Sequence, residues 1–460
     1  LKKLCNEVFG EKNFVACLVY DKNRKNDAKY FSVGHEYMLV YFKSAATMNE
    51  RGTILRMTKE GVEEVKAEFE RLRELFNDDW SKVNEGLKAL YGSWGKDDPR
   101  KSLSRFTKVD EKGPYRDDGN ISWPGGGGPR YEVLHPITHK PCKIPSRGWI
   151  YPNPNRMKEE IERGRVVFGQ DETTTPRIRT NLFESDTEVM RSVHFSYAQT
   201  ASQTFNAIFE NRRVFENPKS IDDIKNLVEY VTAKDDGDII LDFFSGSATT
   251  AHAVMQLNAE DGGNRQFVMV QLPEITDEKS EAYKAGYKNI CEIGEERIRR
   301  AGEQIKTDWE KEHSSDGLFV SDEKFTTDIG FKVFKLDSTN VNEWDPNMKL
   351  DEKELALRLG EVFKEGRSKE DILYEIMLKY GMFDKQVKEI NVNGKPMYRV
   401  GKRYMIVCLE DSITSEDVKA IGELSPKTVI FNEAGFNNDN DKINATYNLK
   451  QCGVEDIKCI

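Results

Sequence analysis

The sequence predicts an α/β protein in three parts: a core of strands and helices, an irregular β-rich region inserted into it, and a small C-terminal α/β domain. Three observations carry this prediction. An apolar run at 239–244 leads through small residues into a helix-favouring segment, and a second apolar run follows at 267–272. Between 100 and 181, helix signals are scarce while Gly, Pro and Arg abound. Beyond residue 314, short strand and helix patterns alternate.

Composition limits the class of protein. A chain of 460 residues usually forms about two or three domains, and 38% hydrophobic residues are enough to build cores. No apolar run approaches the roughly 20 residues that a membrane-spanning helix needs, so we expect no membrane partner. The seven cysteines are scattered without paired spacing, which favours reduced thiols and a cytoplasmic location.

The first 90 residues combine helix and strand patterns. Residues 1–9 are helical in pattern, the runs 14–20 and 37–43 favour strands, and 60–90 form a long, charged, amphipathic helical region. The basic linker 21–27 separates the two strands. Two readings of this linker stand: a phosphate contact and a solvated loop.

The segment 100–180 is basic in an otherwise acidic chain. The chain has a formal net charge of −10, but this window holds 16 Lys or Arg against 10 Asp or Glu, a net charge of +6. Its arginines alternate with aromatic residues, as at Arg147, Trp149 and Tyr151, and the run 122–131 must be a loop because it contains four glycines and two prolines. Such segments suit contacts to phosphates and base edges. An ordinary irregular β-rich insertion explains the composition equally well.

His135, His139 and Cys142 have spacings that a metal ion can use. The sequence shows neither an evident fourth ligand nor a paired-cysteine frame. We therefore predict no metal site.

The strand–turn–helix at 239–257 has the residue types of a ligand site. Asp242 ends the strand, where its carboxylate can accept backbone N–H groups and hold the turn. Gly246 and its small neighbours permit close approach of a ligand. No Lys follows Gly246, so a phosphate-gripping loop is excluded, and Ala248 and Ala251 replace the later glycines of the dinucleotide pattern. A cofactor without a polyphosphate fits, and a plain strand–helix turn is the alternative.

Helix signals flank this unit. Ser220 is placed to cap a helix at 221–231, with Asp223 as the second member of a capping box. The segment 278–309 is mostly helical. In the C-terminal domain we expect two helices within 350–381 and a hairpin turn at Asn393-Gly394. Further strands are expected at 404–409, 429–431 and near 457, with helices after 415 and 445.

Three ordered motifs together resemble a known family. The residues around Asp242, Asp-Phe-Phe-Ser-Gly-Ser-Ala-Thr-Thr, resemble the AdoMet-binding motif of β-class DNA amino-methyltransferases, usually Asp-x-Phe-x-Gly-Ser-Gly-Thr-Thr. The run 215–220, Phe-Glu-Asn-Pro-Lys-Ser, resembles the motif that precedes it, and 266–274 resembles the strand that follows it. The order is most similar to the modification subunit of type III restriction-modification systems, and the resemblance covers most of the chain.

This resemblance implies a Rossmann-like AdoMet-dependent methyltransferase core. It assigns 1–50 and 211–313 to the core, 51–210 to target recognition and 314–460 to a C-terminal α/β domain. It implies S-adenosyl-L-methionine (AdoMet) contacts from Pro218, Lys219, Asp242, Phe243, Phe244, Ser245, Gly246, Ser247, Thr249, Gln271 and Glu274. The candidate DNA contacts are Arg130, Arg147, Arg163, Arg177 and Arg179.

Two departures from the family pattern matter. Ala248 stands where the family has Gly. This Ala leaves the ligand side of the turn open, provided that the φ of Ala248 is negative. The catalytic Asp-Pro-Pro-Tyr motif does not occur in the sequence: Asp98-Pro99 is followed by Arg100. In the family order this motif comes first, so we expect it to lie before Leu1.

The implied function is transfer of a methyl group from AdoMet to the exocyclic amine of adenine in double-stranded DNA. The implied partners are a helicase-endonuclease restriction subunit and a second copy of the chain. This chain would carry the cofactor and recognition parts, without a catalytic residue of its own. The alternative is a non-catalytic DNA-binding specificity polypeptide that needs a partner chain.

Overall fold

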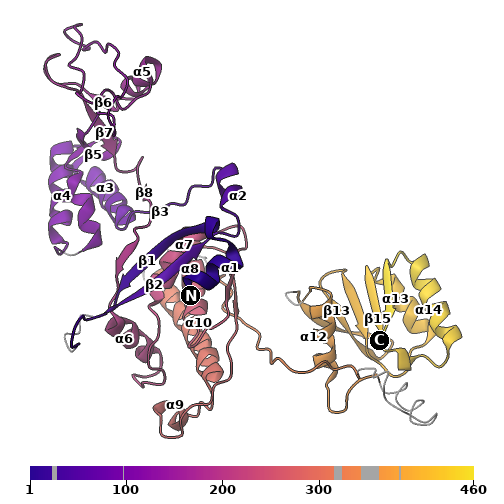
Figure 1. The fold of residues 1–460 in the computed structure, drawn as a ribbon. Coiled ribbons are helices and arrows are strands. Elements are labelled where there is room, and N and C mark those ends of the chain that lie inside the picture. Colours follow the sequence, from indigo (N-terminus) through magenta and orange to yellow (C-terminus); the bar gives the residue numbers. More distant parts are fainter. Residues whose placement is uncertain (23–27, 97, 315–323, 343–361, 383–384) are drawn as a thin grey trace. The chain divides into compact units, whose positions relative to one another are not determined.

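The computed structural model describes residues 1–22, 28–96, 98–314, 324–342, 362–382 and 385–460. The chain divides into two compact units, Leu1–Lys332 and Val333–Ile460, whose elements are labelled in Figure 1. The two readings of the linker 21–27, a phosphate contact and a solvated loop, fall largely on residues 23–27, which lie outside the described residues. The predicted domain boundaries are finer than this division and remain predictions.

The N-terminal part of the first unit forms a three-stranded sheet. Helix α1 (Lys2–Phe9) precedes the antiparallel pair β1 (Phe14–Asp21) and β2 (His35–Tyr41), which confirms the expected helix and strands. Strand β9 (Val193–Phe195) joins β1 in parallel, so that the strand order is β2-β1-β9. The long segment between β2 and β9 therefore leaves this sheet and returns to it.

That inserted segment begins and ends at paired strands. Helix α2 (Ala45–Glu50) follows β2, and β3 (Met57–Thr58) pairs antiparallel with β8 (Thr187–Glu188). Between them, the expected helical region at 60–90 is two helices, α3 (Val62–Phe76) and α4 (Trp80–Ser93). The break falls at Asn77 and Asp78, which adopt positive φ values of 49° and 59°. The two helices share a core that includes Val65, Phe69, Leu72, Val83 and Leu87.

The rest of the insertion is built on a small sheet. Its order is β4-β5-β7-β6, formed by Lys108–Asp110, Gly113–Gly119, Arg177–Asn181 and Val166–Val167. Helix α5 (Pro154–Glu162) starts five residues before the expected 159–165, because the Asn153 side chain accepts from the N–H of Arg156 and caps it there. The run 122–131 is a loop as predicted, and the buried Trp149 lies in the core beneath this region.

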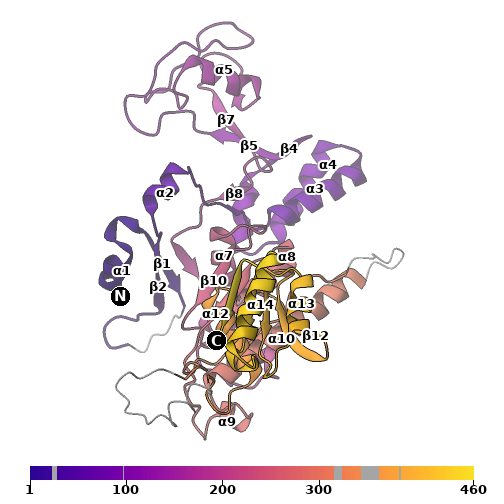
Figure 2. The same ribbon diagram turned by 90° about the vertical axis from the view of Figure 1, so that its right-hand side faces the viewer.

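The predicted strand–helix–strand unit is present in the core. Helices α6 (Ala198–Ile208) and α7 (Ile221–Val231) precede β10 (Ile239–Asp242), α8 (Thr249–Asp261) and β11 (Gln266–Met269), and β10 and β11 are parallel. The short helix α9 (Glu281–Lys284) leads to the long helix α10 (Ile290–Ser314). Strand β10 and the helices α7, α8 and α10 are labelled in Figure 2.

The helices pack on one face of the β10–β11 pair. Ile240 and Phe267 contact apolar residues of α7 and α8, and Phe267 and Met269 also contact apolar residues of α8 and α10. On the opposite face, Ile239 and Leu241 are 62% and 59% exposed. This parallel pair is therefore covered on one side only.

Ser220 caps α7 as predicted, but the capping box does not form. The Ser220 hydroxyl accepts from the N–H of Asp223 at 3.2 Å. The Asp223 carboxylate instead accepts from Lys22, the residue that follows β1. The sequence-based expectation was wrong here because a long-range ion pair competes for the carboxylate.

The second unit is a five-stranded sheet with helices on both faces (Figure 1). The strands β12 (Val387–Val392), β13 (Lys395–Val400), β14 (Met405–Cys408), β15 (Thr428–Phe431) and β16 (Asp456–Cys459) are ordered as numbered. Apolar residues of α12 (Lys369–Lys379) pack on one face, and those of α13 (Ser415–Glu423) and α14 (Asp439–Gln451) on the other. The hairpin turn is confirmed, with Asn393 and Gly394 at positive φ. The first expected helix of 350–381 falls largely outside the described residues.

Candidate functional site

Asp242 organises the turn between β10 and α8. Its Oδ1 accepts from the N–H of Phe244 at 3.3 Å, and its Oδ2 accepts from the hydroxyl of Thr250 at 2.6 Å. The carboxylate thus ties the end of the strand to the start of the helix. This confirms the prediction that Asp242 holds the shape of the turn, and the Thr250 hydroxyl is a partner that the sequence did not indicate.

The three motifs meet at Gly246. The N–H of Gly246 donates to Oε1 of Gln271, just beyond β11, at 2.7 Å. On another side, a Cβ added to Gly246 would lie 3.4 Å from the Phe215 ring, and the residue has a positive φ of 50°. Any side chain at position 246 would therefore be strained. The turn, the end of the second strand and the segment before α7 form one local site.

The start of α8 offers unpaired backbone donors. Among the described residues, the backbone N–H groups of Ser247, Thr249 and Thr250 have no acceptor, and the first residue before the helix, Ala248, provides no capping side chain. Such N–H groups, with the helix dipole, attract anionic ligand groups. The condition under which Ala248 was expected to leave the ligand side open, a negative φ, is not met: its φ is 57°. The turn imposes this left-handed geometry, which Gly adopts more easily.

The other candidate cofactor residues surround this turn with different exposures. Pro218 is buried, while Lys219 forms an exposed ion pair with Glu36 of β2 at 2.8 Å. Phe243 and Phe244 are 63% and 74% exposed. The remaining candidates also lie in the turn or after β11: Ser245, Ser247, Thr249 and Glu274.

Arg297 on α10 is a site residue that the sequence reading missed. It is fully buried, and its Nη1 donates to the carbonyl and hydroxyl oxygens of Ser247 at 3.2 and 3.0 Å and to the Thr249 hydroxyl at 2.6 Å. Its guanidinium also lies 5.1 Å from the centroid of the Phe205 ring. A signal existed, because Arg297 stands on the apolar stripe of the helix, four residues after Ile293.

Burial changes the acid–base properties of this region. It lowers the pKa of Arg297 to about 9, so the side chain remains a cation at neutral pH. Burial, followed by the charge of Arg297, lowers the pKa of His252 on α8 to about 3. The helix therefore carries a neutral histidine beside a buried positive charge.

The candidate DNA-contact arginines differ in what they already bind. Arg147 and Arg177 are exposed, and no ion-pair partner is found for either in the described parts of the chain. Arg130 donates to the carbonyl of Ser146. Arg163 pairs with the buried Glu160 at 3.3 Å, and Arg179 pairs with Asp110 and lies 3.6 Å over the Tyr115 ring. Arg130, Arg147 and Arg177 thus have no carboxylate partner among the described residues, and of these three only Arg147 and Arg177 also make no side-chain hydrogen bond there.

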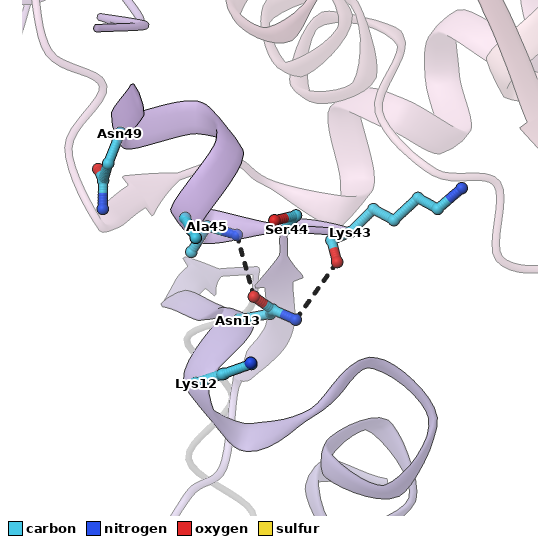
Figure 3. Close-up of a pocket in the computed structure, with 7 residues that line it drawn as sticks. Lys12, Asn13, Lys43, Ser44, Ala45 and Asn49 are labelled. Atoms are coloured by element: carbon cyan, nitrogen blue, oxygen red, sulfur yellow. Dashed lines mark hydrogen bonds between the residues drawn. The ribbon is translucent and has the colours of Figure 1, made fainter. Parts of the chain in front are cut away.

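Other features of the described residues do not add a site. A pocket of about 410 Å³ lies between Asn13 and the start of α2 (Figure 3). There Asn13 accepts from the N–H of Ala45 and donates to the carbonyl of Lys43, so its amide is satisfied. His135 binds the backbone of its own turn and the carbonyl of Gly169, and no cluster of three metal-ligand side chains occurs in the described ranges. Among the same residues, no helix is long and apolar enough to cross a membrane.

The comparison with protein families decides where this chain belongs. A model described as DNA methylase matches residues 1–302, which include the β10–α8 turn and Arg297. The chain belongs to the DNA methylase family. The match also includes the basic inserted segment.

This member of the family is similar to several curated proteins. The Mod subunit of the type III restriction-modification enzyme EcoP15I from Escherichia coli is 27% identical, over 95% of this chain and 64% of the relative. The StyLTI Mod subunit from Salmonella typhimurium is 27% identical over 73% of the chain and 43% of the relative. The type II methyltransferase M.KpnI from Klebsiella pneumoniae is 25% identical over 64% of each. The chain spans less than two thirds of the length of these relatives.

Proposed function

We propose that this chain is the cofactor-binding and DNA-recognition part of an adenine-specific, AdoMet-dependent DNA methyltransferase, the modification subunit of a type III restriction-modification system. The observation that carries the cofactor assignment is the meeting of Phe215, Gly246 and Gln271 at the turn after β10. In open α/β sheets, ligands bind at the carboxyl ends of the strands, where this turn stands. The similarity to type III Mod subunits supports the assignment to that system.

The residues present fit AdoMet. The free N–H groups at the start of α8 suit a carboxylate. Gly246 has no side chain, so the space between its backbone and the Phe215 ring stays open to a ligand. The exposed rings of Phe243 and Phe244 offer apolar surface beside the turn. AdoMet, when bound, supplies the methyl group on its sulfonium sulfur. The chain's own part is to hold and orient this donor through Asp242, Gln271 and the turn between them.

The DNA-recognition role is proposed for the inserted region. Arg147 stands in a tight turn, where the N–H of Gly128 donates to its carbonyl and Gly148 has a positive φ of 82°. The exposed guanidinium is therefore carried by a well-defined backbone. Arg177 follows Pro176 at the start of β7. Exposed, unpaired arginines on such frames suit contacts to phosphates and guanine edges.

The acceptor half of the active site is proposed to come from further polypeptide that carries the Asp-Pro-Pro-Tyr motif. Support comes from the uncovered face of β10 and β11, since parallel strands are normally buried on both faces. Ile239 and Leu241 on this face continue into exposed Val270 and Leu272 beyond β11. Added strands or helices that cover this surface would place acceptor residues beside the cofactor turn. A cytoplasmic homodimer that binds a restriction subunit completes the proposal.

The alternative is a specificity polypeptide that binds DNA and acts only with a partner chain. It shares the binding properties of the main proposal and differs in where the missing motif resides. The absence of Asp-Pro-Pro-Tyr from the sequence favours neither over the other.

Cofactor binding is tested by calorimetry and by the melting temperature. AdoMet should bind the wild-type chain and raise its melting temperature, and Asp242→Ala should abolish both effects because it releases the turn. Asp236→Ala, at an exposed position before β10, is the matched control and should bind like the wild type. An Asp242→Ala chain that binds AdoMet normally would overturn the proposed site.

Methyl transfer is tested with labelled AdoMet and mixed-sequence duplex DNA. The chain alone should transfer no label, whereas a longer chain carrying Asp-Pro-Pro-Tyr should label adenine. Activity restored by a separate partner polypeptide, and not by extension, would favour the specificity-polypeptide alternative. Label on cytosine would refute adenine specificity.

A further inference from the structure

Arg297 is a buried cation for which the described residues provide no anion. Its side chain is fully buried, its Nε has no hydrogen-bond partner, and no carboxylate oxygen of the described chain lies within 4.0 Å of its nitrogens. All three of its hydrogen bonds go to neutral oxygens of Ser247 and Thr249. Burying a charge without an opposite charge is strongly unfavourable. Binding of an anionic ligand group nearby would offset this unfavourable free energy.

Arg297 lies behind the turn that begins α8. The free N–H groups at the start of this helix already create a positive potential. Gly294, one turn earlier on α10, allows the two elements to approach: a Cβ there would lie 3.3 Å from the Gly246 carbonyl oxygen. The charge of Arg297 and the N-terminus of α8 therefore both make the electrostatic potential at the turn positive. Because the surrounding residues are buried, water screens this potential little.

We propose that Arg297 is a positioning residue for an anionic group of the ligand, and that this group is the carboxylate of AdoMet. The inference rests on the proposed cofactor function. Arg297 does not touch the ligand in this proposal: its hydrogen bonds fix Ser247 and Thr249, and its charge favours an anion at the free N–H groups of the turn. Arg297 thus fixes the geometry of the turn and also makes the electrostatic potential of the site positive.

Two ligands that differ only in the carboxylate test this role. AdoMet and decarboxylated AdoMet are titrated into the wild type, Arg297→Lys and Arg297→Met, and each dissociation constant is measured by calorimetry. Arg297→Met should weaken AdoMet by about tenfold or more, equivalent to about 1.4 kcal/mol, and decarboxylated AdoMet by less than about threefold. Arg297→Lys keeps the charge and should restore most of the preference.

Phe205→Leu is the control for a purely structural effect. It removes the ring that lies 5.1 Å from the Arg297 guanidinium but keeps the buried charge, so it should weaken both ligands by the same factor. If Arg297→Met does not fold, Arg297→Gln, which is also neutral and keeps polar donors toward Ser247 and Thr249, takes its place. Equal losses for both ligands in each neutral Arg297 variant that folds would overturn the inference and leave the cofactor site standing. Failure of the wild type to bind AdoMet would overturn the proposed function, and this inference with it.

Discussion

Replacing His252 should remove a large part of the acid sensitivity of the first unit. His252 is 6% exposed on α8, and its Nδ1 has no hydrogen-bond partner. Burial, followed by the charge of Arg297, lowers its pKa from 6.5 to about 3. Between these two pH values the unfolded chain binds a proton at this histidine and the folded chain does not. Stability is therefore lost as the pH falls through this window.

The expected size follows from the two pKa values. Between pH 7 and pH 5, the difference in proton binding reduces the free energy of unfolding by about 2 kcal/mol at 25 °C. In His252→Gln, which cannot take up this proton, the loss over the same interval should be about 2 kcal/mol smaller than in the wild type. Carboxylates contribute equally to both chains and cancel in this difference.

Urea unfolding at pH 7 and pH 5 measures the effect. Tryptophan fluorescence mainly reports the first unit, because five of the six tryptophans of the chain belong to it. His139→Asn, at an exposed position of the inserted region with a positive φ of 57°, which Asn tolerates, is the control and should lose as much stability as the wild type. Equal acid losses in His252→Gln and the wild type would refute the reasoning.

Three further predictions follow from the same structure. Ala248→Gly should change the free energy of unfolding by less than about 1 kcal/mol, since relief of the left-handed φ offsets the lost methyl burial, whereas Ala248→Val should cost about 2–4 kcal/mol in a melting experiment. Glu160→Gln should destabilise the inserted region by about 1–3 kcal/mol, because its carboxylate is 3% exposed between three partly exposed arginines; unchanged urea unfolding would contradict this. Arg147→Ala and Arg177→Ala should each lower the slope of log Kd for duplex DNA against log salt by about 0.9 if they bind phosphate, at an unchanged melting temperature, whereas Arg179→Ala should lower the melting temperature.

Local signals account for what the sequence predicted well. The strand–turn–helix–strand order from β10 to β11, the Asn393-Gly394 hairpin and the Ser220 cap depend on residues close together in the chain, where periodicity and turn chemistry act directly. The role of Asp242 could be predicted for the same reason. Its acceptor function follows from its place at the end of a strand.

Long-range packing accounts for what the sequence missed. The carboxylate of Asp223 is taken by Lys22, about two hundred residues away, so no local pattern could show it. Arg297 is buried only because α10 lies against the turn at Gly246. The break at Asn77 was a missed local signal, since Asn tolerates left-handed geometry. The sequence could not single out Arg147 and Arg177 either, because the ion pairs of arginines such as Arg163 and Arg179 are seen only in the structure.

The pairing of β3 with β8 makes the inserted region separable in principle. The chain enters and leaves this region at two adjacent antiparallel strands, and Met57 lies opposite Glu188. Its helices and its small sheet have their own cores, one around Phe69 and one around Trp149. An insertion with neighbouring ends and internal cores can be exchanged between related chains as a cassette, because the register of the β2-β1-β9 sheet is undisturbed. Such an exchange between β3 and β8 would leave the turn around Gly246 unchanged.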